Sequence, residues 1–384
     1  MNDTFMKEKP VFPLIMSMAL PMVISMLVNS LYNIVDSFFV AQISEDAMTA
    51  LSLVYPVQNL INAVMIGFGI GINAVISFYL GAQDKKMADR AATQGMLLGT
   101  IHGVGFMILG IAVMRPFLQM FTGNAQIVDY GVRYSRIAFL FATALSWQLV
   151  FEKTFQAVGR MVESMTCMMS GAIINIILDP IMIFGLLGCP AMGVTGAAVA
   201  TVIGQCVAAV VAFTCNHKFN TEIKIRFQGF RPDIKIIGTI YAIGVPSIIM
   251  QSIGSVMTYS MNRILIAFSS TATAVFGVYF KLQSFFFMPV FGLNNGITPI
   301  IAFNYGAQNR KRMIKTIKLS LITAFCLTFV GFLSFELIPQ VLLGMFNASE
   351  DMLAIGIPAL RIIGVHYLIA WFCIICGTVF QALG

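Results

Sequence analysis

The chain has 384 residues, of which 58% are hydrophobic and only 10% are charged, and its formal net charge at pH 7 is +7. A soluble domain carries about a quarter charged residues, so this chain cannot cover its surface with polar groups. The composition excludes a water-soluble protein and predicts an integral membrane protein.

Ten apolar runs are long enough to cross a bilayer, whose hydrocarbon core of about 30 Å requires about 20 residues of α-helix. They are continuous rather than alternating, which excludes the strand pattern of a membrane barrel. The first run is too long for a cleaved signal peptide and is interpreted as a retained span. The predicted spans are residues 12–42, 48–80, 92–118, 134–158, 162–187, 193–216, 233–267, 271–304, 316–343 and 352–383.

Basic residues gather in the loops on one side of the predicted membrane. Of the 23 lysines and arginines, 16 precede the first span or follow the second, fourth, sixth and eighth spans. Cytoplasmic loops are enriched in these residues, so the N-terminus is predicted to be cytoplasmic. The positive charge then reflects membrane topology, and no nucleic-acid partner is expected.

The second half of the sequence repeats the first half in a single register. In this register the GAQ of residues 81–83 aligns with the GAQ of 306–308, and the FQA of 155–157 aligns with the FQA of 380–382. Both copies begin on the same side of the membrane, so the repeat is parallel. Parallel repeats are typical of secondary transporters, in which two bundles move around a central site.

The repeat predicts an all-α, polytopic protein built from two pseudo-symmetric helical bundles. Residues 1–216 form an N-terminal lobe of six spans, residues 217–235 a cytoplasmic linker, and residues 236–384 a C-terminal lobe of four spans. In this register the second copy reaches only its fourth span. A continuation to about residue 441 would complete twelve spans, of which ten are present.

A polar stripe runs along the first predicted span. Asn29, Asn33 and Asp36 are spaced at intervals that place them on one face of a helix. A charge in the middle of a membrane helix costs about 2.5–3.5 kcal/mol on insertion scales, so ionisable residues at such positions are functional by default. Asp36 aligns with Met261 in the second copy, which argues against a structural need common to both lobes.

The sequence NIILDP, residues 175–180, places a second acid in the fifth span. Asn175 and Asp179 share one helix face, and Pro180 cannot donate a backbone hydrogen bond and bends the helix. We predict that Asp36 and Asp179 face each other with Asn175 beside them. Two carboxylates and an amide oxygen suit a sodium ion or a proton relay. The alternative is that buried, protonated acids only hold the helices together.

Two further charges lie within predicted spans. Glu152 lies about two turns from the cytoplasmic end of the fourth span, close in sequence to Lys153 and Arg160. Ion pairing, snorkelling to the interface and a transport role all remain open for it. Lys281 either pairs with an acid across a central cleft or reaches an interface. His102 is interpreted as a packed histidine.

Four motifs resemble the MATE (multidrug and toxic compound extrusion) transporters, and especially their DinF-type and MepA-like branch. They are ALPMVISMLVNSLYNIVDSFFVAQI, GAQDKK, NIILDPIMIFG and GVTGAAVAT. The resemblance implies two lobes around a V-shaped cavity in the bacterial plasma membrane. It implies export of bulky, mostly cationic drugs against an inward proton or sodium gradient, by a monomer without another cofactor.

The resemblance also implies a cation site in the N-terminal lobe. Its residues would be Asp36, Asn175, Asp179 and, in GAAVAT, Thr201. The chain departs from the family in its four-span second lobe. The acids that NorM-type members carry in that lobe are not evident, which favours coupling through the N-terminal lobe.

Two alternatives to drug export have less support in the sequence. A lipid-linked oligosaccharide flippase of the same superfamily would line its cavity with several basic residues, but only Lys281 qualifies. An intramembrane enzyme would need a catalytic motif, and the sequence contains no HExxH, GxSxG or Walker pattern.

Overall fold

The structure is a computed structural model, and it describes residues 4–220, 222–227, 230–265, 267–346 and 349–384. These residues form α-helices and one 3-10 turn, without a strand. Helices are expected because lipid offers no hydrogen bonds, so each backbone group must find its partner within its own segment.

Within the described ranges, eight helices are each long and apolar enough to cross a membrane. They are α2 (Val11–Ala41), α3 (Glu45–Gly81), α4 (Lys85–Gln119), α7 (Met161–Phe184), α8 (Val194–Phe219), α9 (Ile234–Leu265), α10 (Ser270–Gly306) and α11 (Arg310–Leu337). The pair α13 (Glu350–Gly364) and α14 (Tyr367–Leu383) is bent by 49° and makes a ninth span if counted as one.

The fourth predicted span corresponds to two shorter helices placed end to end. These are α5 (Ala125–Leu140) and α6 (Ala142–Ala157), each of 16 residues, with Phe141 between them. Neither is long enough to cross a membrane alone. The ten predicted spans therefore appear among the described residues as eight single helices and two pairs. Short elements α1 (Thr4–Glu8), η1 (Leu186–Gly188) and α12 (Pro339–Gly344) complete the chain.

Helix boundaries in the second half repeat those in the first in the predicted register. Helices α3 and α10, α4 and α11, and α5 and α13 each begin at residues that the repeat aligns. Their N-caps match in kind: Ser44 and Ser269 each accept a hydrogen bond from the backbone three residues later. Gln83 and Gln308 both adopt left-handed backbone angles, with φ of 61° and 54°. The two-bundle architecture predicted from the repeat is thus present.

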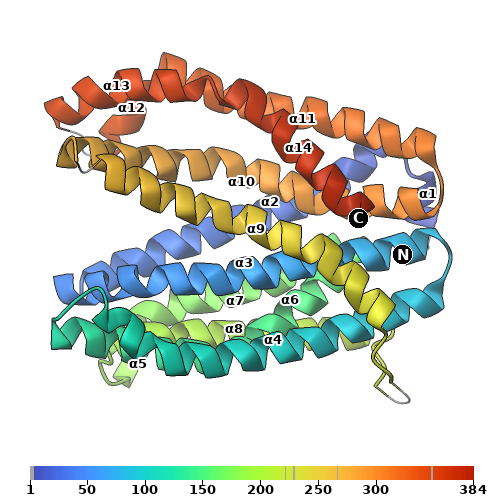
Figure 1. Cartoon of the computed structure of the whole chain (residues 1–384), viewed down its shortest axis with the longest axis horizontal. Helices are drawn as coiled ribbons and strands as arrows, with labels where there is room; N and C mark the ends of the chain where they lie inside the picture. The colour runs from blue at the N-terminus through green and yellow to red at the C-terminus, as the bar shows by residue number, and fades with distance from the viewer. Residues whose placement is uncertain (1–3, 221, 228–229, 266, 347–348) are drawn as a thin grey trace.

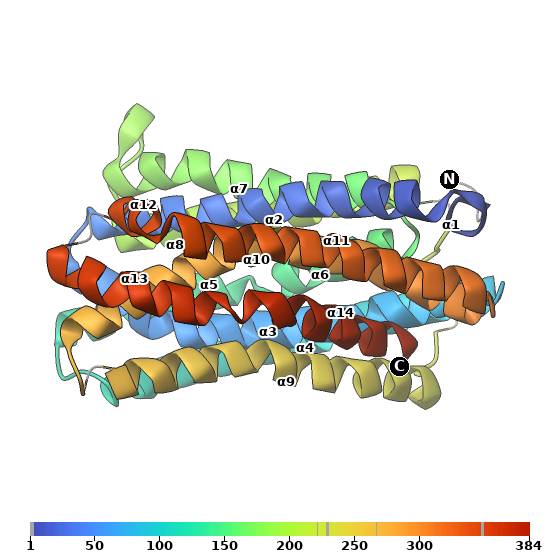
Figure 2. The same cartoon turned by 90° about the horizontal axis from the view of Figure 1, so that it is seen from above.

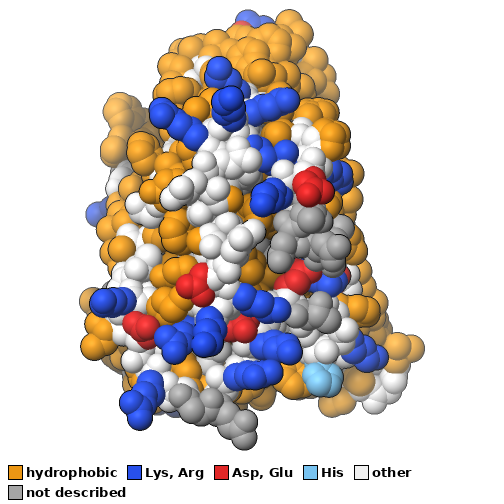
Figure 3. Space-filling model, turned by 90° about the vertical axis from the view of Figure 1, so that its right-hand side faces the viewer, with side chains coloured by type: hydrophobic (Ala, Val, Ile, Leu, Met, Phe, Trp, Pro, Cys, Tyr) orange, Lys and Arg blue, Asp and Glu red, His pale blue; other side chains and the backbone are white. Residues whose placement is uncertain are grey.

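All long helices lie roughly parallel, with α10 to α14 along one side of the molecule and α4 to α8 along the other (Figure 1). Figure 2 shows the same bundle from above. We call α2 to α8 the first lobe and α9 to α14 the second lobe. One end of the bundle, which carries both termini, gathers Lys and Arg side chains over its surface (Figure 3). We call it the basic end.

The lobes meet backbone to backbone near the basic end, where α2 and α3 pack against α10 and α9. We call this contact the seam. A Cβ added to Gly81 would lie 1.9 Å from the carbonyl oxygen of Phe303, and one added to Gly306 would lie 2.0 Å from that of Phe78. The internal repeat aligns Gly81 with Gly306 and Phe78 with Phe303, so the two contacts are equivalent. Only glycine allows helices to approach this closely.

Toward the opposite end the lobes are not packed in this way. The part of α2 near the basic end buries Leu14, Met18 and Met22 completely. From residue 26 to residue 39, no described side chain of α2 is buried, and the same holds for α9 from residue 248 onward. Among the described residues, the lobes are thus closed against each other at the basic end, and α2 and α9 are more open to their surroundings toward the other end.

Candidate functional site

Three neighbouring helices of the first lobe carry the predicted cation-site residues. Helix α2 carries Asp36, α7 carries Asn175 and Asp179, and α8 carries Thr201. Close packing of α7 and α8 depends on Gly204, where a Cβ would lie 2.7 Å from the carbonyl oxygen of Gly171. This approach brings the two helices near enough for their polar side chains to bond.

Asn175 connects Asp179 to Thr201. With its amide oriented to satisfy both neighbours, Asn175 donates from Nδ2 to Oδ2 of Asp179 at 2.8 Å. Its Oδ1 lies 3.2 Å from Oγ1 of Thr201. Asp179 has no exposed surface and Asn175 is 2% exposed, so this chain of contacts is dry.

The carboxyl groups of Asp36 and Asp179 lie within hydrogen-bonding reach of each other, as the sequence predicted. On each, Oδ1 is buried and has no hydrogen-bond partner among the described residues. Two carboxylates in contact repel each other when both are ionised, so a proton or a cation between them stabilises the pair. These unpartnered oxygens fit the donor set that Na⁺ or a shared proton requires.

Two tyrosines and a glutamine complete this cluster, and sequence reasoning missed them. The hydroxyl groups of Tyr32 on α2 and Tyr134 on α5 both lie close to Thr201. Gln58 on α3 donates to the Tyr134 hydroxyl at 3.3 Å. Tyr32 precedes Asp36 by four residues, so the helix-face argument applied to the asparagines would have found it.

The remaining residues predicted in this region have other surroundings. Asn33 donates to the backbone oxygen of Asn29 at 2.8 Å and to its side-chain oxygen at 3.1 Å, so these two bond to each other along α2. Asn33 is exposed. Pro180 lies inside α7, which continues without interruption from Met161 to Phe184.

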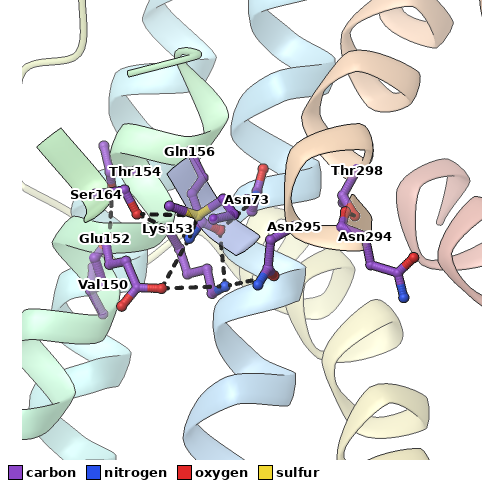
Figure 4. A network of polar contacts seen from close by, with 11 residues as sticks. Asn73, Val150, Glu152, Lys153, Thr154, Gln156, Ser164, Asn294, Asn295 and Thr298 are labelled. Atoms are coloured by element: carbon purple, nitrogen blue, oxygen red, sulfur yellow. Dashed lines mark hydrogen bonds and ion pairs between the residues drawn. The ribbon is translucent and has the colours of Figure 1, made fainter. Parts of the chain in front are cut away.

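A second polar network lies nearer the basic end and contains a buried ion pair (Figure 4). Glu152 and Lys153 on α6 are 2% and 3% exposed, and Lys153 Nζ lies 3.7 Å from Glu152 Oε1. Gln156 donates to the same carboxylate oxygen at 3.0 Å. Of the interpretations left open for Glu152, the structure excludes snorkelling and shows ion pairing.

Of the two alternatives left open for Lys281, pairing with an acid across a cleft is not seen among the described residues. Lys281 is exposed, and no hydrogen bond or ion pair reaches it from the described parts of the chain. The buried base is Lys153 instead. His102 is packed as expected: it lies against Phe68, with ring centroids 4.7 Å apart, and bonds the hydroxyl of Tyr241 on α9 at 2.9 Å.

Comparisons with known proteins give matches that cover most of the chain. A family model described as MatE matches residues 21–181 and 246–384, two segments whose first residues are aligned by the internal repeat. Multidrug export protein MepA of Staphylococcus haemolyticus (strain JCSC1435) is 28% identical over 332 residues, which cover 85% of this chain and 72% of that protein.

Solved structures resemble this one closely. A crystal structure of MATE in complex with MaL6 superposes with a TM-score of 0.93 and 26% identity, covering 100% of this chain and 85% of that one. A structure described as the outward-facing conformation of a multidrug resistance MATE family transporter of the MOP superfamily gives 0.92 and 25%, covering 99% and 84%.

Proposed function

The chain belongs to the MatE family of membrane transporters, and on that premise we propose that it is a cation-coupled multidrug efflux antiporter. It exports bulky, mostly cationic organic compounds by alternating access, driven by an inward gradient of H⁺ or Na⁺. The observation that carries the proposal is the contact between the carboxyl groups of Asp36 and Asp179, with Asn175 and Thr201 beside them.

Coupling follows from the position of this pair. A proton or cation between the two carboxyl groups holds α2 against α7, and its loss leaves two like charges in contact within a dry site. The resulting repulsion acts on α2 where it is least packed, between residues 26 and 39. Because α2 also packs against α10 at the seam, a movement of α2 changes the position of the first lobe relative to the second.

The proposal includes a membrane orientation. With the basic end facing the cytoplasm, the protein lies in the bacterial plasma membrane as a monomer with a cytoplasmic N-terminus. The open side of the structure then faces outward, the arrangement in which drug is released and the coupling cation enters. The name of the staphylococcal relative, a multidrug export protein, supports the choice of substrates.

Ethidium transport in everted membrane vesicles tests the proposal. Vesicles that contain the protein are energised, and the proton and sodium gradients are then dissipated separately with selective ionophores. We expect ethidium accumulation to collapse when one of the two gradients is lost. Transport that continues without either gradient, or no transport of any organic cation tested, would overturn the proposal.

A further inference from the structure

Lys153 lies beside the seam, one turn from the end of α6 at the basic end. Of the lysines that the structure describes, it alone is buried. Its stem passes over Gly69 of α3, where an added Cβ would lie 2.9 Å from Lys153 Cγ. A glycine at this position lets the lysine of the first lobe reach past α3 toward the second lobe.

The ammonium group of Lys153 faces three oxygen atoms. On its own helix, it donates to Oε1 of Gln156 at 2.9 Å and forms an ion pair with Oε1 of Glu152 at 3.7 Å. It also donates to Oδ1 of Asn295 on α10, at 3.3 Å across the seam. Figure 4 shows this side chain directed at the ammonium group. An ammonium ion has three donors, so Asn295 supplies one of the two hydrogen bonds that the group makes to side chains.

Asn295 stands in a part of the seam where the backbones of the two lobes are in close contact. It lies between Gly292 and Gly296, where an added Cβ would lie 2.6 Å from the backbone of Val23 and 2.8 Å from that of Ala19. Parting the lobes at the basic end would therefore remove Asn295 from Lys153. The two acceptors on α6 would stay, because they belong to the same helix as the lysine.

We propose that Lys153 and Asn295 form a lock that holds the basic end closed during the transport cycle. The hydrogen bond exists only while the lobes meet at the seam, so it stabilises the closed arrangement over the arrangement open at this end. Glu152 and Gln156 hold the Lys153 ammonium group in both arrangements. The lock can therefore re-form without removing water from a solvated lysine. Lys153 is thus a positioning residue and touches no transported molecule. This proposal rests on the alternating access proposed above.

Distance measurements between the lobes test the lock. Spin labels are attached to cysteines at Lys85 and Arg310, exposed residues that begin α4 and α11 at the basic end, after the seven native cysteines have been replaced. Molecules open at the basic end give long distances between the labels, and closed molecules give short ones. The ratio of these two populations is measured in lipid. The measurement needs no drug and no gradient, so its result is independent of whether the export proposal holds.

Asn295→Leu removes the acceptor while keeping a similar size and leaving the Glu152–Lys153 pair intact. We expect this variant to raise the open-to-closed ratio about tenfold, the equivalent of about 1.4 kcal/mol. Asn294→Leu is the matched control. It alters the neighbouring residue, whose amide points away from the network and whose Oδ1 has no partner in the described structure (Figure 4). It should leave the ratio unchanged.

A double-mutant cycle separates the lock from packing. Glu152→Leu combined with Lys153→Met removes the ion pair as a unit, and adding Asn295→Leu to that variant should produce no further shift. The proposal is overturned if Asn295→Leu shifts the ratio no more than Asn294→Leu does. It is also overturned if Asn295→Leu has its full effect without Lys153, because Asn295 then acts through packing alone.

Discussion

Asp179 is a carboxylic acid with no exposed surface, in a helix that crosses a membrane. Its neighbours supply one hydrogen bond from Asn175 and a contact with Asp36, but no positive charge is seen near it among the described residues. A site with two acids and no base is complete only with a proton or a cation. This local imbalance distinguishes it from the Glu152–Lys153 pair, which is neutral by itself.

Replacing either acid by its amide tests the coupling role. Asp36→Asn and Asp179→Asn should each abolish gradient-driven ethidium efflux, because an amide cannot exchange a proton and holds a cation poorly. Asn175→Ala should weaken efflux less, because both acids remain. Efflux rates in everted vesicles are compared at matched protein levels, determined by immunoblot. Near wild-type rates in both amide variants would mean that these residues only pack the helices.

Removing one member of the buried ion pair should be costly. Lys153→Met leaves the Glu152 carboxylate buried without its partner, and we expect a loss of about 3–5 kcal/mol of stability, seen as a lower Tm in detergent. Lys281→Met is the matched control, because that side chain is exposed and should change the Tm little. Equal losses in the two variants would show that burial of the ion pair does not determine stability.

Charged residues inside apolar runs are visible in a sequence, which is why Asp36, Asp179 and Glu152 could be identified from it. The partners of a long side chain are not visible. Lys153 is buried because Gly69, on a different helix, leaves room for its stem. The burial of Lys153 depends on how α3, α6 and α10 meet, and the sequence pattern contains no signal for that contact.

At the scale of helices, the repeat carried most of the predictive power. The first residues of α3 and α10 are aligned by the repeat with no offset. The agreement follows because matching caps and turns recur in both copies. Hydropathy alone did not reveal the breaks at Phe141 and between α13 and α14. Phe141 and Val365, which lie at these breaks, are apolar, and the single His366 beside Val365 changes a window of about 20 residues little.

The seam glycines should tolerate no side chain. Gly81→Ala and Gly306→Ala each place a Cβ about 2 Å from a carbonyl oxygen of the other lobe, so the helices must move apart. We expect a cost of about 1–3 kcal/mol and longer Lys85–Arg310 spin-label distances. Gly105→Ala, where the added Cβ meets nothing within 4 Å, is the control. Unchanged distances in both seam variants would show that the closed end does not depend on this contact.

For the whole molecule, the framework is symmetric and the chemistry is not. Both lobes share helix positions, caps and seam glycines, yet Asp36 corresponds to Met261 and Lys153 to Thr378. The charges are therefore asymmetric on a symmetric frame. The first lobe holds the candidate coupling site and the buried ion pair, and on the proposals made above the second lobe supplies the surface against which both would act.

Membrane orientation can be checked directly in a cysteine-free background. Lys85→Cys lies at the basic end of α4, and Met120→Cys lies at the other end of the same helix, about 50 Å away. An impermeant maleimide should label Met120→Cys in intact cells, and Lys85→Cys only in inside-out vesicles, because basic loops face the cytoplasm. The reverse pattern would invert the proposed orientation.

The side-chain amide of Asn175 has an oxygen and a nitrogen of similar size, and a half-turn exchanges them. With Asp179 ionised, the nitrogen faces the acid, as in the orientation described for the site. The opposite orientation would set the amide nitrogen against the backbone N–H of Thr201, which lies 3.0 Å away, so two donors would face each other. Thr201 therefore fixes which end of the amide Asp179 meets, whatever the charge of the acid. An amide fixed in this way always offers Asp179 a donor, so a proton on this acid has to lie on the oxygen that Asn175 does not reach.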